Sequence, residues 1–312
     1  MDTVHTPALL KEVIEYLNPK PGDQIIDATL DGGGHTLALL QKFTDIKILG
    51  IEWDSQLFEE AVKKFKSLKV EDRLVLVNDN YTNIGNVVRE YNFRPNGILF
   101  DLGLSSWHYE KSGRGFSFRR DEPLDMRYNA YQEVKSKNEK VKTAAEIINT
   151  YNEENLERIF REYGEEKFSK QIADQIIKSR KSKPILKTSE LVEVINRSVP
   201  VWYKKRKIHF ATKTFQALRI EVNAELRNVE EGVIAAINVL KPACPEQGRR
   251  GGRLAVISFH GVEDKIVREI FKKKVKEGTV KWAVKGTVRP EWEEIKNNPR
   301  ARSAKMKIVE KI

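Results

Sequence analysis

The sequence predicts an α/β fold in which a parallel, doubly wound sheet is interrupted by an all-helical insertion. Two observations predict it. Short apolar runs alternate with amphipathic helical patterns over about the first hundred residues, and the alternation resumes near residue 214. Between these stretches the apolar residues recur at helical spacing only. The predicted domains are therefore a sheet domain in two parts, 1–108 and 214–312, and a helical domain over 109–213.

The first part of the sheet domain begins with a helical pattern around Val13 and Leu17, which ends at Asn18-Pro19. A glycine cluster, Asp31–Thr36, leads into a second helix from Leu37 to Phe43. Four apolar runs predict strands at Gln24–Ala28, Ile46–Ile51, Leu74–Val77 and Gly97–Phe100. Parallel strands bring their carboxyl ends to one edge of a sheet, which is where ligands bind in this fold class.

Three apolar stripes predict the helices of the insertion. The stripes are Leu156, Ile159, Phe160 and Tyr163; Phe168, Ile172 and Ile176; and Leu191, Val192, Ile195 and Val199. Thr188 is predicted to cap the third helix. After the insertion we expect one helix over Phe215–Leu240, a strong strand at Arg253–His260, and a closing pair of strands near Thr279–Lys285 and Lys305–Val309.

Composition narrows the function. Lys and Arg number 56 against 45 Asp and Glu, and the net charge of +11 favours a polyanionic partner. The single cysteine, Cys244, excludes an intrachain disulfide and fits a reducing compartment. The apolar stretch Gly232–Leu240 is too short to span a membrane, and no signal peptide is expected at the N-terminus. The five histidines lack metal-ligand spacing. We therefore expect a cytoplasmic protein with no membrane partner and no metal.

The glycine cluster and the next strand end indicate a nucleoside site. After Gly32 and Gly34, the third glycine position of the dinucleotide fingerprint holds Leu37, so a pyrophosphate is not required. Glu52 ends the second strand, where a carboxylate can accept hydrogen bonds from two ribose hydroxyls. S-adenosylmethionine fits this pattern better than NAD does. The alternative for Glu52 is a solvent-facing cap.

Asp101 ends the fourth strand and is predicted to face the same crevice as Glu52. Its carboxylate can accept a hydrogen bond from an amine that is being methylated, or from the cofactor. The alternative is an aspartate that only caps the following loop. Trp107 and His108 come shortly after it and can frame a base or an adenine, although each alone is more often structural.

Two segments are candidate RNA contacts. The loop Arg114–Arg127 interleaves arginines with aromatic residues, which suits base stacking and phosphate contacts on single-stranded RNA. A second basic cluster precedes Ile208. The candidates are Trp107, Arg114, Phe116, Phe118, Arg119 and Arg120 in the first segment and its approach, and Lys204, Lys205 and Arg206 in the second. The alternative for both segments is a solvated surface.

An eight-residue segment, Ala243–Arg250, separates Lys241-Pro242 from Gly251-Gly252, which together would form a tight turn. We expect a surface loop extension, which costs little stability. Cys244 lies in this segment and not at a strand end. Methylation at C5 of cytosine needs a cysteine nucleophile, so that chemistry is disfavoured.

Several long motifs resemble the bacterial 16S rRNA cytidine-N4 methyltransferase family, RsmH (MraW). They cover nearly the whole chain. The motifs are His5–Leu10, Asp27–Thr29, Gly32–Thr36, Asp101–Ser106, Arg114–Phe118, Pro123–Arg127, Tyr163–Glu166, Thr214–Ile220, Ile257–His260 and Asn298–Ser303. The sequence departs from the family at Glu52, where Asp is usual, at His108, where Gln is usual, at Gly261-Val262, where Ser-Leu is usual, and in Ala243–Arg250.

The resemblance implies a Rossmann-like, S-adenosylmethionine-dependent methyltransferase sheet with a helical insertion. It implies transfer of a methyl group to N4 of cytidine 1402 of 16S rRNA, in the decoding centre of the small ribosomal subunit. By position, it implies cofactor contacts at Gly33, Gly34, His35, Glu52, Tyr81, Asp101 and His108.

For such a reaction we expect direct displacement, with no covalent bond between protein and RNA. Catalysis then depends on alignment and on an acceptor for the N4 proton, for which Asp101 is the candidate. The target base has to leave its stack. Two other classes share part of the pattern. A nicotinamide dehydrogenase has the same fold but needs the missing glycine, and a non-catalytic ribosome-binding factor has the same charge but does not need both strand-end acids.

Overall fold

A computed structural model describes residues 7–129 and 141–312. His5 and Thr6 of the first motif lie outside the described residues. The chain forms two compact units: a sheet unit, Met1–Ser105 with Leu226–Ile312, and a helical unit, Ser106–Glu225. The predicted insertion, 109–213, lies within the bounds of the helical unit. Among the described residues, no helix has the length and apolar character needed to cross a membrane.

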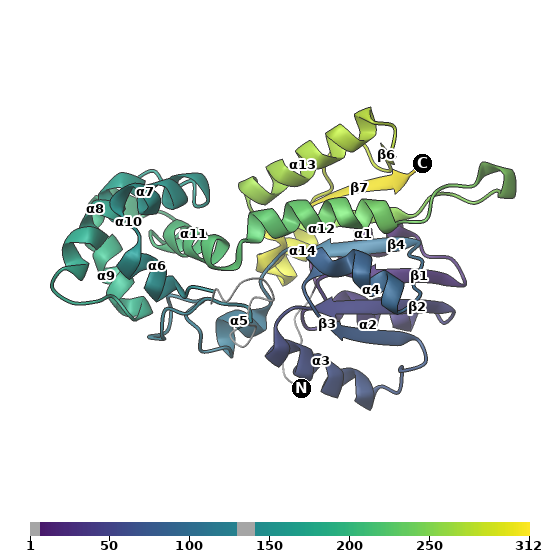
Figure 1. Ribbon diagram of the computed structural model, residues 1–312, viewed down its shortest axis with the longest axis horizontal. Coiled ribbons are helices and arrows are strands. Elements are labelled where there is room, and N and C mark those ends of the chain that lie inside the picture. The colour runs from purple at the N-terminus through teal and green to yellow at the C-terminus, as the bar shows by residue number, and fades with distance from the viewer. Residues whose placement is uncertain (1–6, 130–140) are drawn as a thin grey trace. The chain divides into compact units, whose positions relative to one another are not determined.

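Seven strands form the sheet of the sheet unit, in the order β3-β2-β1-β4-β5-β7-β6. Neighbours from β3 to β5 are parallel, whereas β7 is antiparallel to both β5 and β6 (Figure 1). The strands are β1 (Asp23–Asp27), β2 (Ile46–Glu52), β3 (Leu74–Asn78), β4 (Gly97–Asp101), β5 (Arg253–Ser258), β6 (Val280–Trp282) and β7 (Lys305–Lys311). All seven strands expected from the sequence are confirmed, including the closing pair.

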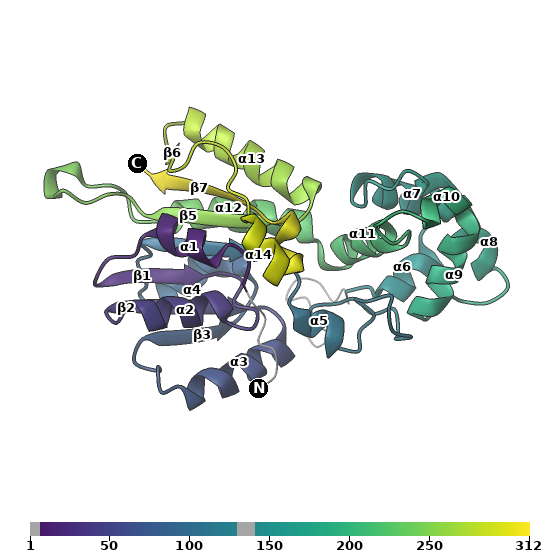
Figure 2. The same cartoon turned by 180° about the vertical axis from the view of Figure 1, so that it is seen from behind.

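Helices cover both faces of the sheet. On one face α4, α12 and α13 pack against alternate strand residues such as Ile26 and Phe100 (Figure 1). On the other face α1, α2 and α3 pack against the intervening residues, such as Ile25 and Leu99 (Figure 2). The helices of this unit are α1 (Leu10–Leu17), α2 (Gly34–Lys42), α3 (Ser55–Ser67), α4 (Ile84–Glu90), α12 (Glu225–Val239), α13 (Gly261–Lys276) and α14 (Trp292–Asn297), with short turns η1 (Tyr81–Asn83), η2 (Pro245–Gln247) and η3 (Pro299–Ser303). Burial on both faces explains why the strands are nearly continuous apolar runs.

The helical unit has its own core. Its helices are α5 (Ser106–Glu110), α6 (Ala144–Thr150), α7 (Glu153–Glu162), α8 (Ser169–Arg180), α9 (Thr188–Ser198), α10 (Val201–Lys204) and α11 (Thr212–Asn223). The three predicted stripes lie on α7, α8 and α9, and their central residues Ile159, Ile172 and Ile195 are fully buried. The helical spacing of these apolar residues is therefore confirmed as the packing face of each helix.

Two local predictions are wrong. The single helix expected over Phe215–Leu240 is two helices, because Ala224 has a left-handed backbone with φ of 48° and ends α11. Apolar spacing continues across this break, so periodicity does not reveal it. Thr188 does not cap α9. It is the first helical residue, and its hydroxyl donates to the carbonyl of Arg120 at 2.5 Å and accepts from the backbone of Glu122 at 3.0 Å.

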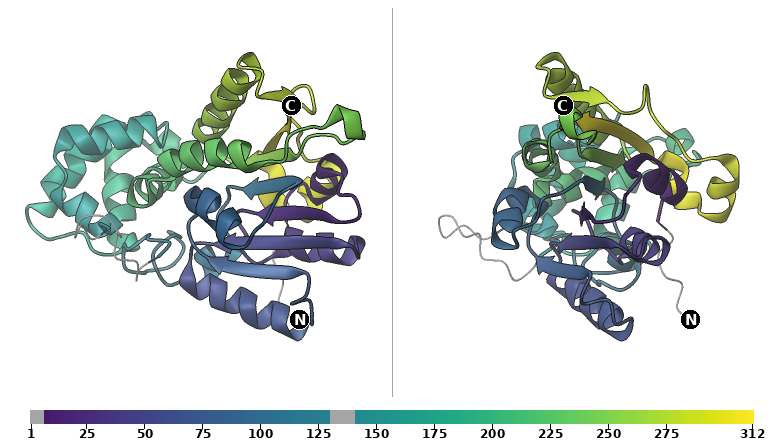
Figure 3. Two further views of the ribbon diagram at one scale, coloured as in Figure 1. Left: turned by 45° about the vertical axis from the view of Figure 1, so that its right-hand side comes forward. Right: turned by 90° about the vertical axis from the view of Figure 1, so that its right-hand side faces the viewer.

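The segment Ala243–Arg250 forms a small hairpin between α12 and β5, drawn in green in Figure 3. Cys244 and Arg249 exchange backbone hydrogen bonds of 2.9 and 3.0 Å. At the base of the hairpin, Gly252 N–H donates to the carbonyl of Lys241 at 2.8 Å. The same bond would close a four-residue turn if the eight residues were absent.

Candidate functional site

Three acids lie at the carboxyl ends of neighbouring parallel strands. Asp27 ends β1, Glu52 ends β2 and Asp101 ends β4, and all three side chains are buried. The strand order reverses between β1 and β4, because the chain adds β2 and β3 on one side of β1 before it returns to β4 on the other. Open α/β sheets bind their ligands at this switch point.

The glycine cluster turns the chain from β1 into α2. Gly33 precedes the helix with φ of 67°, and a Cβ atom there would lie 2.4 Å from the ring of Phe65. Only glycine satisfies both conditions without strain. The Nζ of Lys64 donates to the carbonyl of Gly32 at 2.6 Å. Gly34 begins α2, so the free N–H groups of the first helical turn lie at the switch point.

Two side chains from the first turn of α2 contact the acids. Thr36 donates its hydroxyl proton to Asp27 at 2.7 Å. The Nδ1 atom of His35 lies 3.7 Å from Oδ2 of Asp101, and its Nε2 atom lies 3.0 Å from the carbonyl oxygen of Ala8. The backbone N–H of Asp101 donates to the hydroxyl of Thr29 at 2.6 Å. The strand ends and the helix are thus tied together around the acids.

Glu52 is held by backbone donors on both sides. It accepts from the N–H of Asp31 at 2.9 Å and from the N–H of Asp54 at 2.8 Å. Asp31 has a left-handed backbone with φ of 51°, which turns its N–H toward the carboxylate. Asp54 in turn caps α3. Each oxygen of a carboxylate has two lone pairs, so both oxygens of Glu52 can accept one more hydrogen bond.

The electrostatics of the cluster are unusual. Burial raises the pKa of Asp27 to about 7, of Glu52 to about 8 and of Asp101 to about 8. The neighbouring Asp27 charge further raises the pKa of Asp101. The pKa of Asp31 is raised by burial and by the charges of Glu52 and Asp101. A cation placed among these groups would favour their ionised forms.

Two carboxylate oxygens of the cluster have spare capacity. Within residues 7–129 and 141–312, Oδ1 of Asp27 and Oδ1 of Asp101 are buried and have no hydrogen-bond partner. A buried acceptor without a partner is costly, and a ligand that donates to it recovers that cost.

Tyr81 follows β3 in the short turn η1. Its ring lies edge-on to Phe100 with a centroid distance of 5.3 Å. Helix α12 approaches closely, because a Cβ atom at Gly232 would lie 2.5 Å from the Tyr81 ring. The structure thus fixes this ring by packing, and its contact with a cofactor stays a prediction.

His108 and Trp107 belong to α5 of the helical unit. The His108 ring is buried and lies 5.2 Å, centroid to centroid, from both Phe116 and Tyr128. The guanidinium of Arg114 lies over the rings of Trp107 and Phe116 at 5.4 and 5.6 Å. Four of the predicted site residues therefore form one aromatic cluster.

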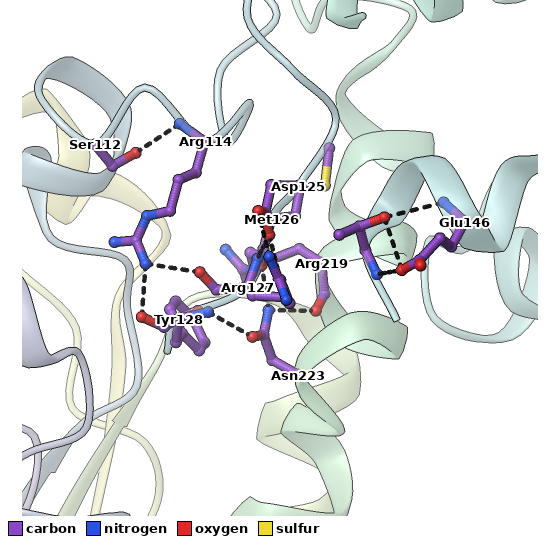
Figure 4. A network of polar contacts seen from close by, with 10 residues as sticks. Ser112, Arg114, Asp125, Met126, Arg127, Tyr128, Glu146, Arg219 and Asn223 are labelled. Atoms are coloured by element: carbon purple, nitrogen blue, oxygen red, sulfur yellow. Dashed lines mark hydrogen bonds and ion pairs between the residues drawn. The ribbon is translucent and has the colours of Figure 1, made fainter. Parts of the chain in front are cut away.

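The Arg114–Arg127 loop is braced from within the helical unit (Figure 4). Arg114 donates to the carbonyls of Arg127 and Tyr128 at 2.8 and 2.7 Å. Asn223, at the end of α11, accepts from the N–H of Tyr128 at 2.8 Å and donates to the carbonyl of Met126 at 2.7 Å. Arg114 and the buried Phe116 hold the loop in shape, and their contact with RNA stays a prediction.

The remaining RNA candidates are more accessible. Arg119 and Arg120 are exposed, and Phe118 stacks on His209 with a centroid distance of 4.4 Å. Lys204 is the last residue of α10 and is half-buried. Lys205 and Arg206 follow the helix and are exposed. These positions leave cationic and aromatic groups of the helical unit open to solvent.

Sequence reasoning missed Asp27 and Asp31 as parts of the site. Asp27 could have been predicted from the sequence, because the strand-end argument that selects Glu52 and Asp101 applies equally to the end of β1. Asp31 gave no comparable signal, since only its left-handed backbone turns it toward Glu52.

The strand order and a family match together assign the class. Antiparallel β7, inserted between β5 and β6, distinguishes this sheet from the classic dinucleotide-binding order, which has no such strand. The parallel strands β3-β2-β1-β4-β5, with helices on both faces, are Rossmann-like, and the match to a methylase family identifies the class as the methyltransferases. The sequence profile of the MraW methylase family matches residues 2–312.

Similar proteins align along their whole length. A protein of Thermosipho melanesiensis named ribosomal RNA small subunit methyltransferase H is 42% identical over 310 residues, which are 99% of this chain and 98% of that protein. Proteins of the same name from Thermosipho africanus and Carboxydothermus hydrogenoformans are 43% and 40% identical, over 99% and 100% of this chain and 98% and 99% of their own lengths. The chain belongs to the MraW methylase family.

Proposed function

We propose that this protein methylates N4 of cytidine 1402 in the 16S rRNA of the small ribosomal subunit, directly from S-adenosylmethionine and without a covalent bond to the RNA. The names of the relatives support rRNA of the small subunit as the substrate. The observation that carries the proposal is the buried carboxylate of Asp101, with one oxygen unpartnered among the described residues, at the switch point of the sheet.

The residues present fit the cofactor. S-adenosylmethionine supplies a methyl group on a positively charged sulfur and carries ribose hydroxyls and an ammonium group that donate hydrogen bonds. Glu52 offers two fixed oxygens to hydroxyl donors, and the turn at Gly33 lets a ligand approach the backbone. The raised pKa values of Asp27, Glu52 and Asp101 fit a site that is completed by positive charge. We further propose contacts at Gly34, His35, Tyr81 and His108.

Asp101 is proposed as the acceptor for the target amine. The lone pair of N4 is delocalised into the cytosine ring, and a hydrogen bond from the amine to a carboxylate localises it. In the absence of a ligand, a pKa of about 8 leaves the Asp101 carboxyl mostly protonated at pH 7. Acceptance therefore requires ionisation, which a neighbouring positive charge promotes. Because of its raised pKa, Asp101 would accept the amine proton only when a positively charged cofactor is bound beside it.

The helical unit is proposed to bind the rRNA. Its exposed Arg119, Arg120, Lys205 and Arg206 suit phosphate contacts, which supply most of the affinity for nucleic acid. The ring of Phe118, stacked on His209, and Trp107 are proposed to contact bases. Because its substrate is ribosomal, the protein is proposed to act in the cytoplasm.

The direct test is incubation of the protein with labelled S-adenosylmethionine and small subunits that lack the modification, followed by nucleoside analysis and mapping of the labelled position. We expect N4-methylcytidine at position 1402. Label in 5-methylcytidine, at another position, or in no nucleoside would refute the proposal.

A further inference from the structure

We propose that the exposed ring of Trp202 at α10, supported by Phe168 and the buried Tyr203 and accompanied by Lys167 and Arg206, is a second RNA-binding surface on which an unpaired base of the rRNA stacks. This inference rests on rRNA being the substrate. It adds a stacking platform that the composition of the basic cluster alone did not reveal, because Trp202 precedes that cluster and Phe168 lies far from it in sequence.

Three rings form the platform. Phe168 lies 4.9 Å from Tyr203 and 5.9 Å from Trp202, and the two neighbours Trp202 and Tyr203 are 5.7 Å apart, all centroid to centroid and all edge-on. Trp202 nevertheless remains 54% exposed. A tryptophan with this much accessible surface leaves area for another flat group to cover.

A buried hydrogen bond fixes the platform. Tyr203 is 3% exposed, and its hydroxyl donates to the buried carboxylate of Glu166, at 2.9 Å from each oxygen. Glu166 also accepts from the backbone N–H of Phe168 at 2.9 Å. The Glu166 carboxylate thus connects the segment that precedes α8 to helix α10. Pre-ordered rings lose little conformational entropy on binding, which favours their use as stacking surfaces.

Cations surround the rings. Nζ of Lys167 lies 5.4 Å from the Trp202 ring centre and 6.0 Å from that of Phe168. The guanidinium of Arg206 lies 5.0 Å from the Tyr203 ring centre. Lys205 and Lys207 are exposed beside it. Aromatic rings interleaved with cations are the composition of single-strand binding surfaces, where bases stack and phosphates meet the charges.

Charge selects RNA over a protein partner as the occupant. Four consecutive basic residues, Lys204–Lys207, begin two positions after Trp202, and Nζ of Lys167 lies 5.4 Å from its ring centre. Such a concentration of positive charge around an exposed ring is complementary to a phosphate backbone.

The test compares Trp202→Ala with Trp202→Phe, which keeps a ring, and with Trp292→Ala, a matched control that removes a tryptophan 75% exposed on α14 of the sheet unit. Binding is measured to extracted, unmodified 16S rRNA, and KM and kcat are measured with unmodified small subunits. Cofactor affinity is measured in parallel.

We expect Trp202→Ala to weaken RNA binding about 10-fold, within the range for loss of one stacked base. KM for subunits should rise by a similar factor while kcat and cofactor affinity stay unchanged. Trp202→Phe should recover most of the affinity, and Trp292→Ala should bind as the unsubstituted protein does.

Unchanged RNA affinity in a folded Trp202→Ala protein overturns the inference, and so does an equal loss in Trp292→Ala. Normal binding to extracted rRNA together with a raised KM for small subunits would assign the surface to a ribosomal protein and would equally overturn it. The binding measurement needs no methyl transfer. If the unsubstituted protein failed to methylate rRNA, the proposed function would fail, while the binding result would still decide this surface.

Discussion

The carboxylate cluster of the sheet unit and the cations and aromatic rings around α10 of the helical unit differ in how their charges are placed. In the sheet unit, acids are buried close together and their pKa values rise to between about 7 and 8. In the helical unit, cations stay in solvent beside partly exposed rings. Burial makes each contact in the first site strong and dependent on its neighbours, whereas exposure makes those in the second weak, additive and sensitive to salt.

The two sites should therefore respond differently to substitution. Loss of one carboxylate from the cluster should strongly reduce methyl transfer or cofactor binding. Loss of one cation from the helical unit should lower RNA affinity only modestly. The proposed functions follow the same division, since a small cationic cofactor offers few contacts and a long polyanion offers many.

The largest effect is expected at Asp101. Asp101→Ala should lower methyl transfer by about 100-fold or more, because a positioned proton acceptor is lost. Single-turnover measurements at saturating cofactor separate this loss from any loss of cofactor affinity. The matched control is Cys244→Ser, which should keep full activity. A covalent complex between the protein and RNA that carries 5-fluorocytidine would contradict direct transfer.

Glu52 tests whether the second strand end holds the ribose. Glu52→Ala should weaken cofactor binding by about 1.5–3 kcal/mol, as expected for charge-assisted hydrogen bonds, with little change in RNA affinity. Glu52→Asp, the residue usual in the family, should retain most of the affinity. Calorimetry on the folded variants gives the answer. Unaltered affinity in Glu52→Ala would remove this side chain from the site.

The raised pKa values predict opposite pH trends for binding and for stability. Because a cation favours ionised acids, cofactor affinity should rise from pH 6 to pH 9. Below a pKa of about 8, Glu52 and Asp101 each contribute up to about tenfold per pH unit. The folded protein without cofactor binds more protons than the unfolded chain between the ordinary pKa values and about 8. Its stability should therefore fall as pH rises through this range.

Calorimetry and thermal unfolding over this pH range measure both trends. Asp101→Asn provides the control, because it removes one titrating group and should flatten both curves. Affinity that does not change with pH would mean that the acids are already ionised without the cofactor.

Salt dependence tests the exposed cations. Each phosphate contact on a single strand contributes about 0.7 to the slope of log affinity against log salt. Neutralising Lys204, Lys205 and Arg206 together should therefore make this slope shallower by about 2. A control that neutralises Lys272, Lys273 and Lys276 on α13 removes the same charge from the sheet unit. Equal slopes for the two triple variants would mean that only net charge matters and that the helical unit has no preferred contact.

The smallest effect is expected from deletion of Ala243–Arg250. The hydrogen bond from Gly252 to Lys241 already closes the remaining turn. Arg250 donates to the carbonyls of Leu17 and Asn18 at the end of α1, so we expect a loss of about 1 kcal/mol in stability and no loss of activity. Thermal unfolding and the methylation assay measure both quantities. A folded but inactive deletion variant would show that the hairpin has a functional role.

The sequence by itself determined the strands, the stripes of the helical unit and two of the three strand-end acids. These features depend on local patterns, because burial on both faces forces continuous apolar runs and burial on one face forces helical spacing. The role of Gly33 could likewise be predicted, since the turn from strand to helix requires the left-handed backbone that glycine adopts without strain. The motifs that resemble the family could also be identified from the sequence alone.

Only the tertiary structure decided how side chains from distant segments meet. It ended α11 at Ala224, while Asn223 bonds a loop almost a hundred residues earlier in the chain. It directed Thr188 to the loop at Arg120 and not to its own helix. It also joined Phe168 to Trp202 and Tyr203, and raised the pKa values of the three acids by burying them together. Periodicity reports which face of a segment is buried, but which other segment covers that face, and what its side chains then donate or accept, follows from packing in three dimensions.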